Sequence, residues 1–243
     1  MNTSSNGYVL GFAVGLCVVI STALSLTAGA LKETQAAAEE FDRQKNVMIA
    51  AGLIKPDEQH VRAELEQIYV ERVKEHVLEL ATGAMDKIEP DAFKKLRDAD
   101  KKPYRLIAVA KDAAGKPDAW VFPISGPGLW SILFGFLALE ADGTHVRGLT
   151  FYKHGETPGL GGECENPEWT AKWVGKSIVD ETGKLVSVTV KKGHVDPTIA
   201  REKAHMVDGL SGATITSNGI TTFLKHDLEG YLPLLKTIWS RKG

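Results

Sequence analysis

The stretch SILFGFLALEADGTHVRGLTFY, residues 131–152, decides how the middle of this chain folds. Two runs rich in apolar residues, 131–140 and 146–152, flank the dipeptide Asp142-Gly143. Asp-Gly between two such runs is a strong signal for a β-hairpin, because these residues tolerate the positive φ angles of a tight turn. The stretch therefore predicts two antiparallel strands joined by a short turn.

The segments on either side of this hairpin extend the pattern. Residues 104–110 and 119–124 are strand candidates upstream of it, and 185–190 is a further candidate downstream. Residues 218–231 have a helical pattern. Consecutive strands joined by short turns imply an antiparallel sheet rather than an alternating βαβ array. We therefore expect an α+β fold, with a mostly antiparallel sheet and packed helices.

Two helical segments are predicted before the sheet. Residues 33–51 have a helical pattern that Gly52 closes. A second helix is expected between Pro56 and Gly83, because apolar side chains recur there with a period near 3.6 residues. These side chains are Val61, Leu65, Ile68, Val73, Val77 and Leu80. We expect the two helices to form a stalk or a lateral packing layer.

The N-terminal part of the chain has the composition of a membrane helix. Residues 1–31 contain no Asp, Glu, Lys or Arg, and the run 8–31 is long enough as a helix to cross a bilayer. A cleaved signal peptide is the alternative, since Ala28-Gly29-Ala30 has the form of a cleavage site, but no basic region precedes the run. We expect one retained transmembrane helix. The flanking charges do not indicate its orientation.

The overall composition limits the classes of function. The chain has 243 residues, 43% hydrophobic and 25% charged, which is typical of a folded globular protein. Its formal net charge of -2 provides no positive field for phosphates, so we expect no nucleic acid partner. We expect three parts: a transmembrane anchor over 1–31, a helical stalk or layer over 32–90, and an α+β domain over 91–243.

The cysteines and histidines do not predict a metal site. Cys17 lies inside the apolar run and Cys164 lies far from it, so no disulfide framework or thiolate cluster is expected. The seven histidines lack the H-x-x-x-H spacing of a metal-binding helix. Cys164 is either an inert thiol or a group that meets a partner.

Three glycine-rich stretches are candidates for ligand-binding loops. The first, 125–130, ends at Trp130 and has the Gly and Pro residues of a turn between two strands. The second, GETPGLGGE at 155–163, would let the backbone approach a flat ligand and expose N–H groups to it, or it is a long irregular turn.

The third stretch, DGLSGATITSNG at 208–219, has the features of a phosphate site. Gly209 and Gly212 free the backbone, hydroxyl residues follow, and a helix is expected where these end. Donors and a helix N-terminus then lie where a phosphate binds favourably. A simple Ser/Thr N-cap is the alternative. The stretch is neither a Walker A loop nor G-x-G-x-x-G.

The segment SGATIT at 211–216 resembles the S/T-G-A-T-x-T motif of the covalent FMN-binding domains. Further matches are GETPGLGGE at 155–163, Asn166-Pro167 with Trp169 and Trp173, Trp173-Val174-Gly175-Lys176, and Asn46-Val47 with Ala51-Gly52-Leu53. Together they resemble the C subunit of the sodium-translocating NADH:quinone reductase. The related G subunit of the Rnf ferredoxin:NAD reductase is the alternative, but the insert at 33–83 and the paired tryptophans favour the C subunit.

The resemblance implies a site for FMN, attached through a phosphoester to the hydroxyl of Thr216. It implies that Leu160 contacts the ring, that Thr157 donates hydrogen bonds, that Glu156 tunes the flavin potential, and that Trp130 forms a wall. The other implied cofactor-binding residues are Asp208, Gly209, Ser211, Gly212, Ala213, Thr214, Gly159 and Gly161. No catalytic residue and no metal ligand is implied.

The charge of such an ester agrees with the surrounding sequence. A phosphate diester carries a charge of about -1, whereas a phosphorylated side chain carries nearly -2. The ester therefore needs little basic compensation, and residues 204–224 contain no Lys or Arg.

The function implied by the resemblance is electron transfer within a six-subunit membrane enzyme. Reducing equivalents from NADH would pass through iron–sulfur and flavin carriers to quinone while sodium is pumped, and this chain would supply one flavin. The implied partners are the other subunits and a flavin transferase. The implied location is the cell inner membrane, with the N-terminus cytoplasmic and the FMN domain periplasmic. A membrane-anchored FMN protein without a catalytic role is the alternative from another class.

Overall fold

The computed structural model describes residues 6–240. The chain divides into two compact units, Met1–Asp42 and Arg43–Gly243. One long helix, α1 (Asn6–Ala50), supplies the described part of the first unit and the first residues of the second. By length and composition α1 is able to cross a membrane. This agrees with the expected single anchor, and the limits predicted at residues 31 and 90 stay predictions.

The predicted segments 8–31 and 33–51 form one uninterrupted helix. Residues with high helix propensity, chiefly alanine, connect them, and no proline intervenes. The helix ends where expected: Gly52 has a φ of +69°, and the amide of Leu53 donates to the carbonyl of Met48 at 2.9 Å. This closure by a left-handed glycine is a common helix C-terminus.

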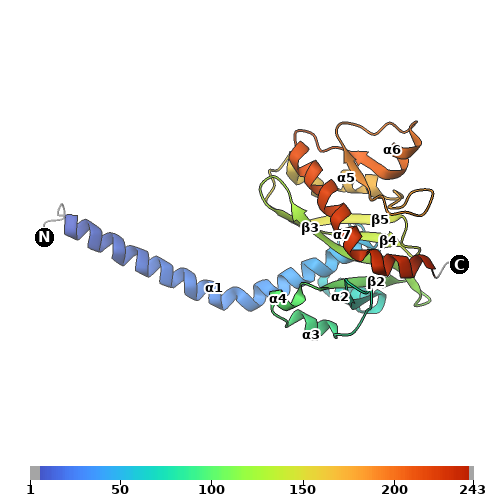
Figure 1. The fold of residues 1–243 in the computed structure, drawn as a ribbon. Helices are drawn as coiled ribbons and strands as arrows, with labels where there is room; N and C mark the ends of the chain where they lie inside the picture. Colours follow the sequence, from blue (N-terminus) through green and yellow to red (C-terminus); the bar gives the residue numbers. More distant parts are fainter. Residues whose placement is uncertain (1–5, 241–243) are drawn as a thin grey trace. The chain divides into compact units, whose positions relative to one another are not determined.

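The second unit is built around a five-stranded antiparallel sheet with the strand order β1-β2-β3-β4-β5 (Figure 1). Each strand pairs with the next one along the chain. The strands are β1 (Val73–Glu79), β2 (Tyr104–Lys111), β3 (Pro117–Pro127), β4 (Ile132–Glu140) and β5 (Val146–Lys153). The α+β class and the β4–β5 hairpin are confirmed.

The helix predicted between Pro56 and Gly83 is wrong in its second half. Helix α2 (Arg62–Arg72) ends where β1 begins. Val73 and Val77 are four residues apart, and such a pair shares one face both in a helix and in a strand, so the apolar pattern does not distinguish the two. Pairing with β2 decides the outcome, because it satisfies the backbone of both strands. Two short helices follow β1, α3 (Pro90–Lys94) and α4 (Asp98–Lys101).

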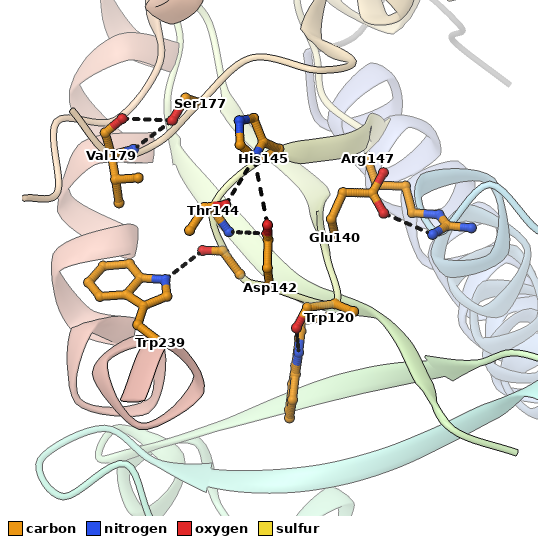
Figure 2. A network of polar contacts seen from close by, with 11 residues as sticks. Trp120, Glu140, Asp142, Thr144, His145, Arg147, Ser177, Val179 and Trp239 are labelled. Atoms are coloured by element: carbon orange, nitrogen blue, oxygen red, sulfur yellow. Dashed lines mark hydrogen bonds and ion pairs between the residues drawn. The ribbon is translucent and has the colours of Figure 1, made fainter. Parts of the chain in front are cut away.

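The turn of the β4–β5 hairpin is held from two other elements (Figure 2). Asp142 Oδ1 accepts a 2.9 Å hydrogen bond from the Thr144 amide, and Gly143 has a φ of +67°. Trp239 Nε1, near the C-terminus of the chain, donates to the Gly143 carbonyl at 2.9 Å. Trp120 of β3 donates its indole N–H to a turn carbonyl at 3.3 Å. The sheet end is therefore tied to the last helix.

That last helix, α7 (Thr214–Ser240), is longer than the predicted 218–231. It passes through Pro233 and changes direction in its C-terminal half (Figure 1). A helix-interior proline breaks one backbone hydrogen bond and bends the axis. Leu234, Leu235 and Ile238 are buried beyond the bend, so packing keeps this segment helical.

The core lies between the sheet and α7. Tyr231 packs its ring on Phe122 of β3 with centroids 4.8 Å apart, and its hydroxyl donates to the Pro123 carbonyl at 2.6 Å. Phe223 meets Phe151 of β5 edge-on at 6.3 Å. Pro123 is tolerated in an inner strand because β3 pairs with β2 only as far as Val121.

A third layer follows β5. It contains the one-turn helices η1 (Gly161–Glu165), α5 (Pro167–Thr170) and η2 (Ala171–Trp173), the helix α6 (Ala200–His205), and the parallel pair β6 (Thr189–Lys191) and β7 (Met206–Asp208). The strand predicted over 185–190 is therefore mostly wrong. Ser187 has a φ of +65°, which interrupts an extended backbone, so the strand begins only at Thr189.

Candidate functional site

The three glycine-rich stretches converge on one buried contact between Glu156 and Thr216. The Thr216 hydroxyl donates a 2.6 Å hydrogen bond to Glu156 Oε2, although the two residues are 60 positions apart. Thr216 is 1% exposed and Glu156 is 5% exposed. A carboxylate this deeply buried needs partners for its charge, and the surrounding backbone provides them.

The Glu156 carboxylate accepts three further hydrogen bonds, all from consecutive backbone amides of the β3–β4 turn. The amide of Leu129 donates to Oε2 at 3.2 Å, and those of Trp130 and Ser131 donate to Oε1 at 2.9 and 3.2 Å. Burial alone would raise the pKa of Glu156. The Thr216 hydroxyl and the three amides outweigh burial and hold the pKa of Glu156 below its ordinary value.

Two glycines let the backbone close on this carboxylate. A Cβ at Gly128 would lie 2.6 Å from Glu156 Oε1. A Cβ at Gly161 would lie 2.6 Å from Glu156 Oε2 and 2.8 Å from the Thr216 hydroxyl oxygen. Any larger residue at either position would displace the pair, so both glycines are required by close approach.

Thr216 lies in the first turn of α7, because the helix begins at Thr214, inside the hydroxyl run. The prediction that the helix begins after this run is therefore wrong. Gly212 has a φ of +68°, which turns the chain into the helix, and the Ser217 hydroxyl accepts the Leu210 amide at 3.2 Å. Local side-chain hydrogen bonds satisfy part of the helix start, so the hydroxyl residues belong to the helix itself.

Exposed apolar side chains lie next to the buried pair. Trp130 and Leu129 extend from the turn that binds Glu156, and Ile215 directly precedes Thr216. Leu160 is also exposed, and its Cδ2 would be 2.7 Å from a Cβ at Gly212, so the second loop touches the third. Exposed apolar groups beside buried polar ones are typical of a site for an amphipathic ligand.

Some residues predicted for the site lie elsewhere or play other parts. The Asp208 carboxylate accepts the Val195 amide at 2.7 Å and Lys172 Nζ at 2.8 Å, so it holds the third layer together. Gly209 packs against the carbonyl of Lys191 in β6. Ala213 is buried in the core, and Thr157, Gly159, Ser211 and Thr214 are exposed.

Sequence reasoning missed the polar residues that shape the turn and the loop. The Ser131 hydroxyl accepts the Gly155 amide at 2.6 Å, and His154 Nδ1 accepts the Glu156 amide at 3.3 Å. The Gly-Pro-Gly run at 126–128 predicts a chain reversal but does not reveal where the amides of Leu129 and Ser131 point.

Cys164 is an unreactive thiol in this fold. It is fully buried in the core, and burial, with smaller contributions from nearby carboxylates, raises its pKa to about 12. A thiol needs its thiolate form to react, so neither oxidation nor metal binding is favoured here. Among the described residues 6–240, no three His, Cys, Asp or Glu side chains are grouped as metal ligands.

Comparison with known proteins defines the class. The family model described as an FMN-binding domain matches residues 128–229, which include the β3–β4 turn, the loop at 155–163 and the start of α7. The fold and the site are thus those of an FMN-binding domain. Two solved structures are similar, both of the C subunit of a Na(+)-translocating NADH-quinone reductase. The one from Parabacteroides distasonis has a TM-score of 0.69 at 29% identity, over 84% of this chain and 96% of that one.

The structure from Shewanella oneidensis has a TM-score of 0.69 at 28% identity, over 84% of this chain and 99% of that one. Among curated proteins, the C subunit from Pseudomonas aeruginosa is 38% identical over 100% of this chain and 98% of its own length. The C subunit from Yersinia pestis is 36% identical over 98% of this chain and 94% of its own. This chain belongs to the family of Na(+)-translocating NADH-quinone reductase C subunits.

Proposed function

We propose that this chain is the FMN-carrying electron-transfer subunit of a Na(+)-translocating NADH-quinone reductase, with FMN joined to Thr216 by a phosphoester. The observation that carries the proposal is the Thr216 hydroxyl, held at the start of α7 by a 2.6 Å hydrogen bond beneath two glycine-rich loops. The match of the whole chain to relatives that are C subunits supports the assignment to this complex.

The residues around Thr216 fit both ends of FMN. The hydroxyl oxygen provides the point of attachment, and backbone amides and the N-terminus of α7 favour a negative group beside it. The exposed side chains of Trp130, Leu160 and Ile215 provide apolar surface for the ring. When bound, FMN supplies the redox chemistry, and the chain binds it, orients it and tunes its surroundings.

The membrane helix and the partners complete this proposal. Residues of α1 anchor the chain in the inner membrane, with the N-terminus cytoplasmic and the FMN domain periplasmic. The other subunits of a six-subunit enzyme exchange electrons with the flavin, and a flavin transferase attaches it. Sodium transport and NADH oxidation are then functions of the whole assembly. The long apolar helix and the names of the relatives support this arrangement.

The attachment is tested by intact mass. We would coexpress the full chain with a flavin transferase and compare wild type with Thr216→Ala, Thr216→Ser and Thr214→Ala. Wild type should gain the mass of one FMN less water and stay yellow after denaturation. Thr216→Ala should gain nothing, Thr216→Ser should keep some covalent flavin, and Thr214→Ala should lose only part of it. Covalent FMN on the Thr216→Ala chain would disprove the assignment.

A further inference from the structure

Three consecutive amides donating to one anionic group form a nest, which is an arrangement that binds anions generally. Here the amides of Leu129, Trp130 and Ser131 surround the Glu156 carboxylate. The same carboxylate is also the partner of the Thr216 hydroxyl. The nest is therefore placed directly beside the hydroxyl that the proposed function assigns to the ester.

The distance between these groups matches a phosphate. Glu156 Oε2 lies 2.6 Å from the Thr216 hydroxyl oxygen, which is close to the separation of two oxygens bonded to one phosphorus atom. A phosphate on Thr216 would thus bring one of its free oxygens to the place that Glu156 Oε2 holds, within reach of the Leu129 amide. Glu156 occupies this place before any ester is present.

We propose that the amides of Leu129, Trp130 and Ser131 are the subsite for the phosphate group on Thr216, and that the Glu156 carboxylate fills this subsite until the ester forms. The inference rests on the proposed attachment of FMN at Thr216. The carboxylate is then a substitute anion. It keeps three buried donors satisfied in the unmodified chain and orients the hydroxyl.

Charge explains why the two anions alternate. A carboxylate and a phosphate diester each carry about one negative charge, so either one suits the same donors. The described partners of the Glu156 carboxylate are backbone amides and one hydroxyl, with no cation among them. Two anions at this distance would repel each other strongly. Glu156 therefore leaves the nest when the ester forms, and its loop moves toward solvent.

The first test needs no flavin and uses the unmodified full chain. In Glu156→Ala the nest is empty, so hydrogen exchange at the 129–131 amides should speed up roughly tenfold or more. Inorganic phosphate should slow this exchange again and raise the Tm, compared with chloride at equal ionic strength. Phosphate should affect neither wild type nor the surface control Glu168→Ala. If phosphate does not restore protection in a folded Glu156→Ala chain, the proposal is overturned.

The second test uses the FMN-loaded chain and Glu156→Gln, which retains a neutral acceptor and is therefore expected to fold. In the unmodified chain this substitution should speed up exchange at 129–131, because the charged acceptor is lost. In the FMN-loaded chain it should have no effect, because phosphate holds the amides. An equal effect in both forms would overturn the proposal. Absence of FMN from Thr216 by mass would instead refute the proposed function, while the phosphate test still reports on the nest.

Discussion

Gly126 of β3 lies directly against Phe223 of α7, so closely that a Cβ at residue 126 would overlap the Cβ and Cγ of Phe223. The contact sets how near α7 approaches the strand whose turn binds Glu156. Farther along the same helix, Gly230 has open space around it. The two glycines therefore differ in what an added methyl group would meet.

Gly126→Ala should lower the free energy of unfolding by about 1–3 kcal/mol, because overpacking forces α7 away from the sheet. Gly230→Ala should raise it by about 0.5–1 kcal/mol, because alanine favours the helix and meets nothing. Urea unfolding of the two variants checks both signs. Equal effects would show that the contact with Phe223 does not limit the position of the helix.

The pH dependence of stability should contain a contribution from Glu156. Its pKa is lowered in the folded chain, so its ionised form stabilises the fold above the unfolded value, near 4.5. This contribution is lost as the pH falls through the lowered folded pKa. The Tm difference between wild type and Glu156→Gln should therefore be largest near neutral pH and shrink in acid. A difference independent of pH would contradict the charge-based account of this contact.

Cys164 should not react with thiol reagents in the folded chain. It is buried, and its pKa of about 12 leaves almost no thiolate at neutral pH. In a Cys17→Ser background, a maleimide should leave the native protein unlabelled and label it fully in denaturant. Rapid labelling of the native protein would mean that the core around Cys164 opens frequently.

The side of the membrane needs an introduced cysteine, because Cys164 is inaccessible. Glu181 lies in an exposed turn of the second unit. In a Cys17→Ser background, Glu181→Cys should react with a membrane-impermeant maleimide in cells whose outer membrane is permeabilised and whose inner membrane is intact. Labelling only after lysis would place the domain in the cytoplasm and contradict the proposed orientation.

Leu160 offers a test of the loop that resembles a flavin contact. It is 43% exposed, so Leu160→Ala should change the free energy of unfolding by less than about 1 kcal/mol. If its side chain contacts the ring, the variant should shift the flavin absorbance and potential. The control is Val70→Ala on α2, also an exposed aliphatic residue, which should leave both unchanged. An unchanged flavin in Leu160→Ala would mean that the ring is held elsewhere.

Local sequence determined the elements whose signals have one interpretation. Asp142-Gly143 between two apolar runs predicts the β4–β5 hairpin, since the turn and its strands are neighbours in the chain. The uncharged run over 8–31 predicts a long apolar helix in the same way. The segment at 211–216 also identified the family, because it is short, contiguous and chemically specific.

Tertiary structure decided whatever depends on residues that are distant in the chain. Val73 and Val77 suit a helix or a strand equally, and only the backbone of β2 makes them part of a sheet. Packing beyond Pro233 likewise carries α7 past the residue that predicts its end. Glu156 and Thr216 meet across 60 positions, and the amides that bind Glu156 come from a third segment. Sequence patterns report local preference, whereas such a contact exists only once the sheet and α7 have packed together.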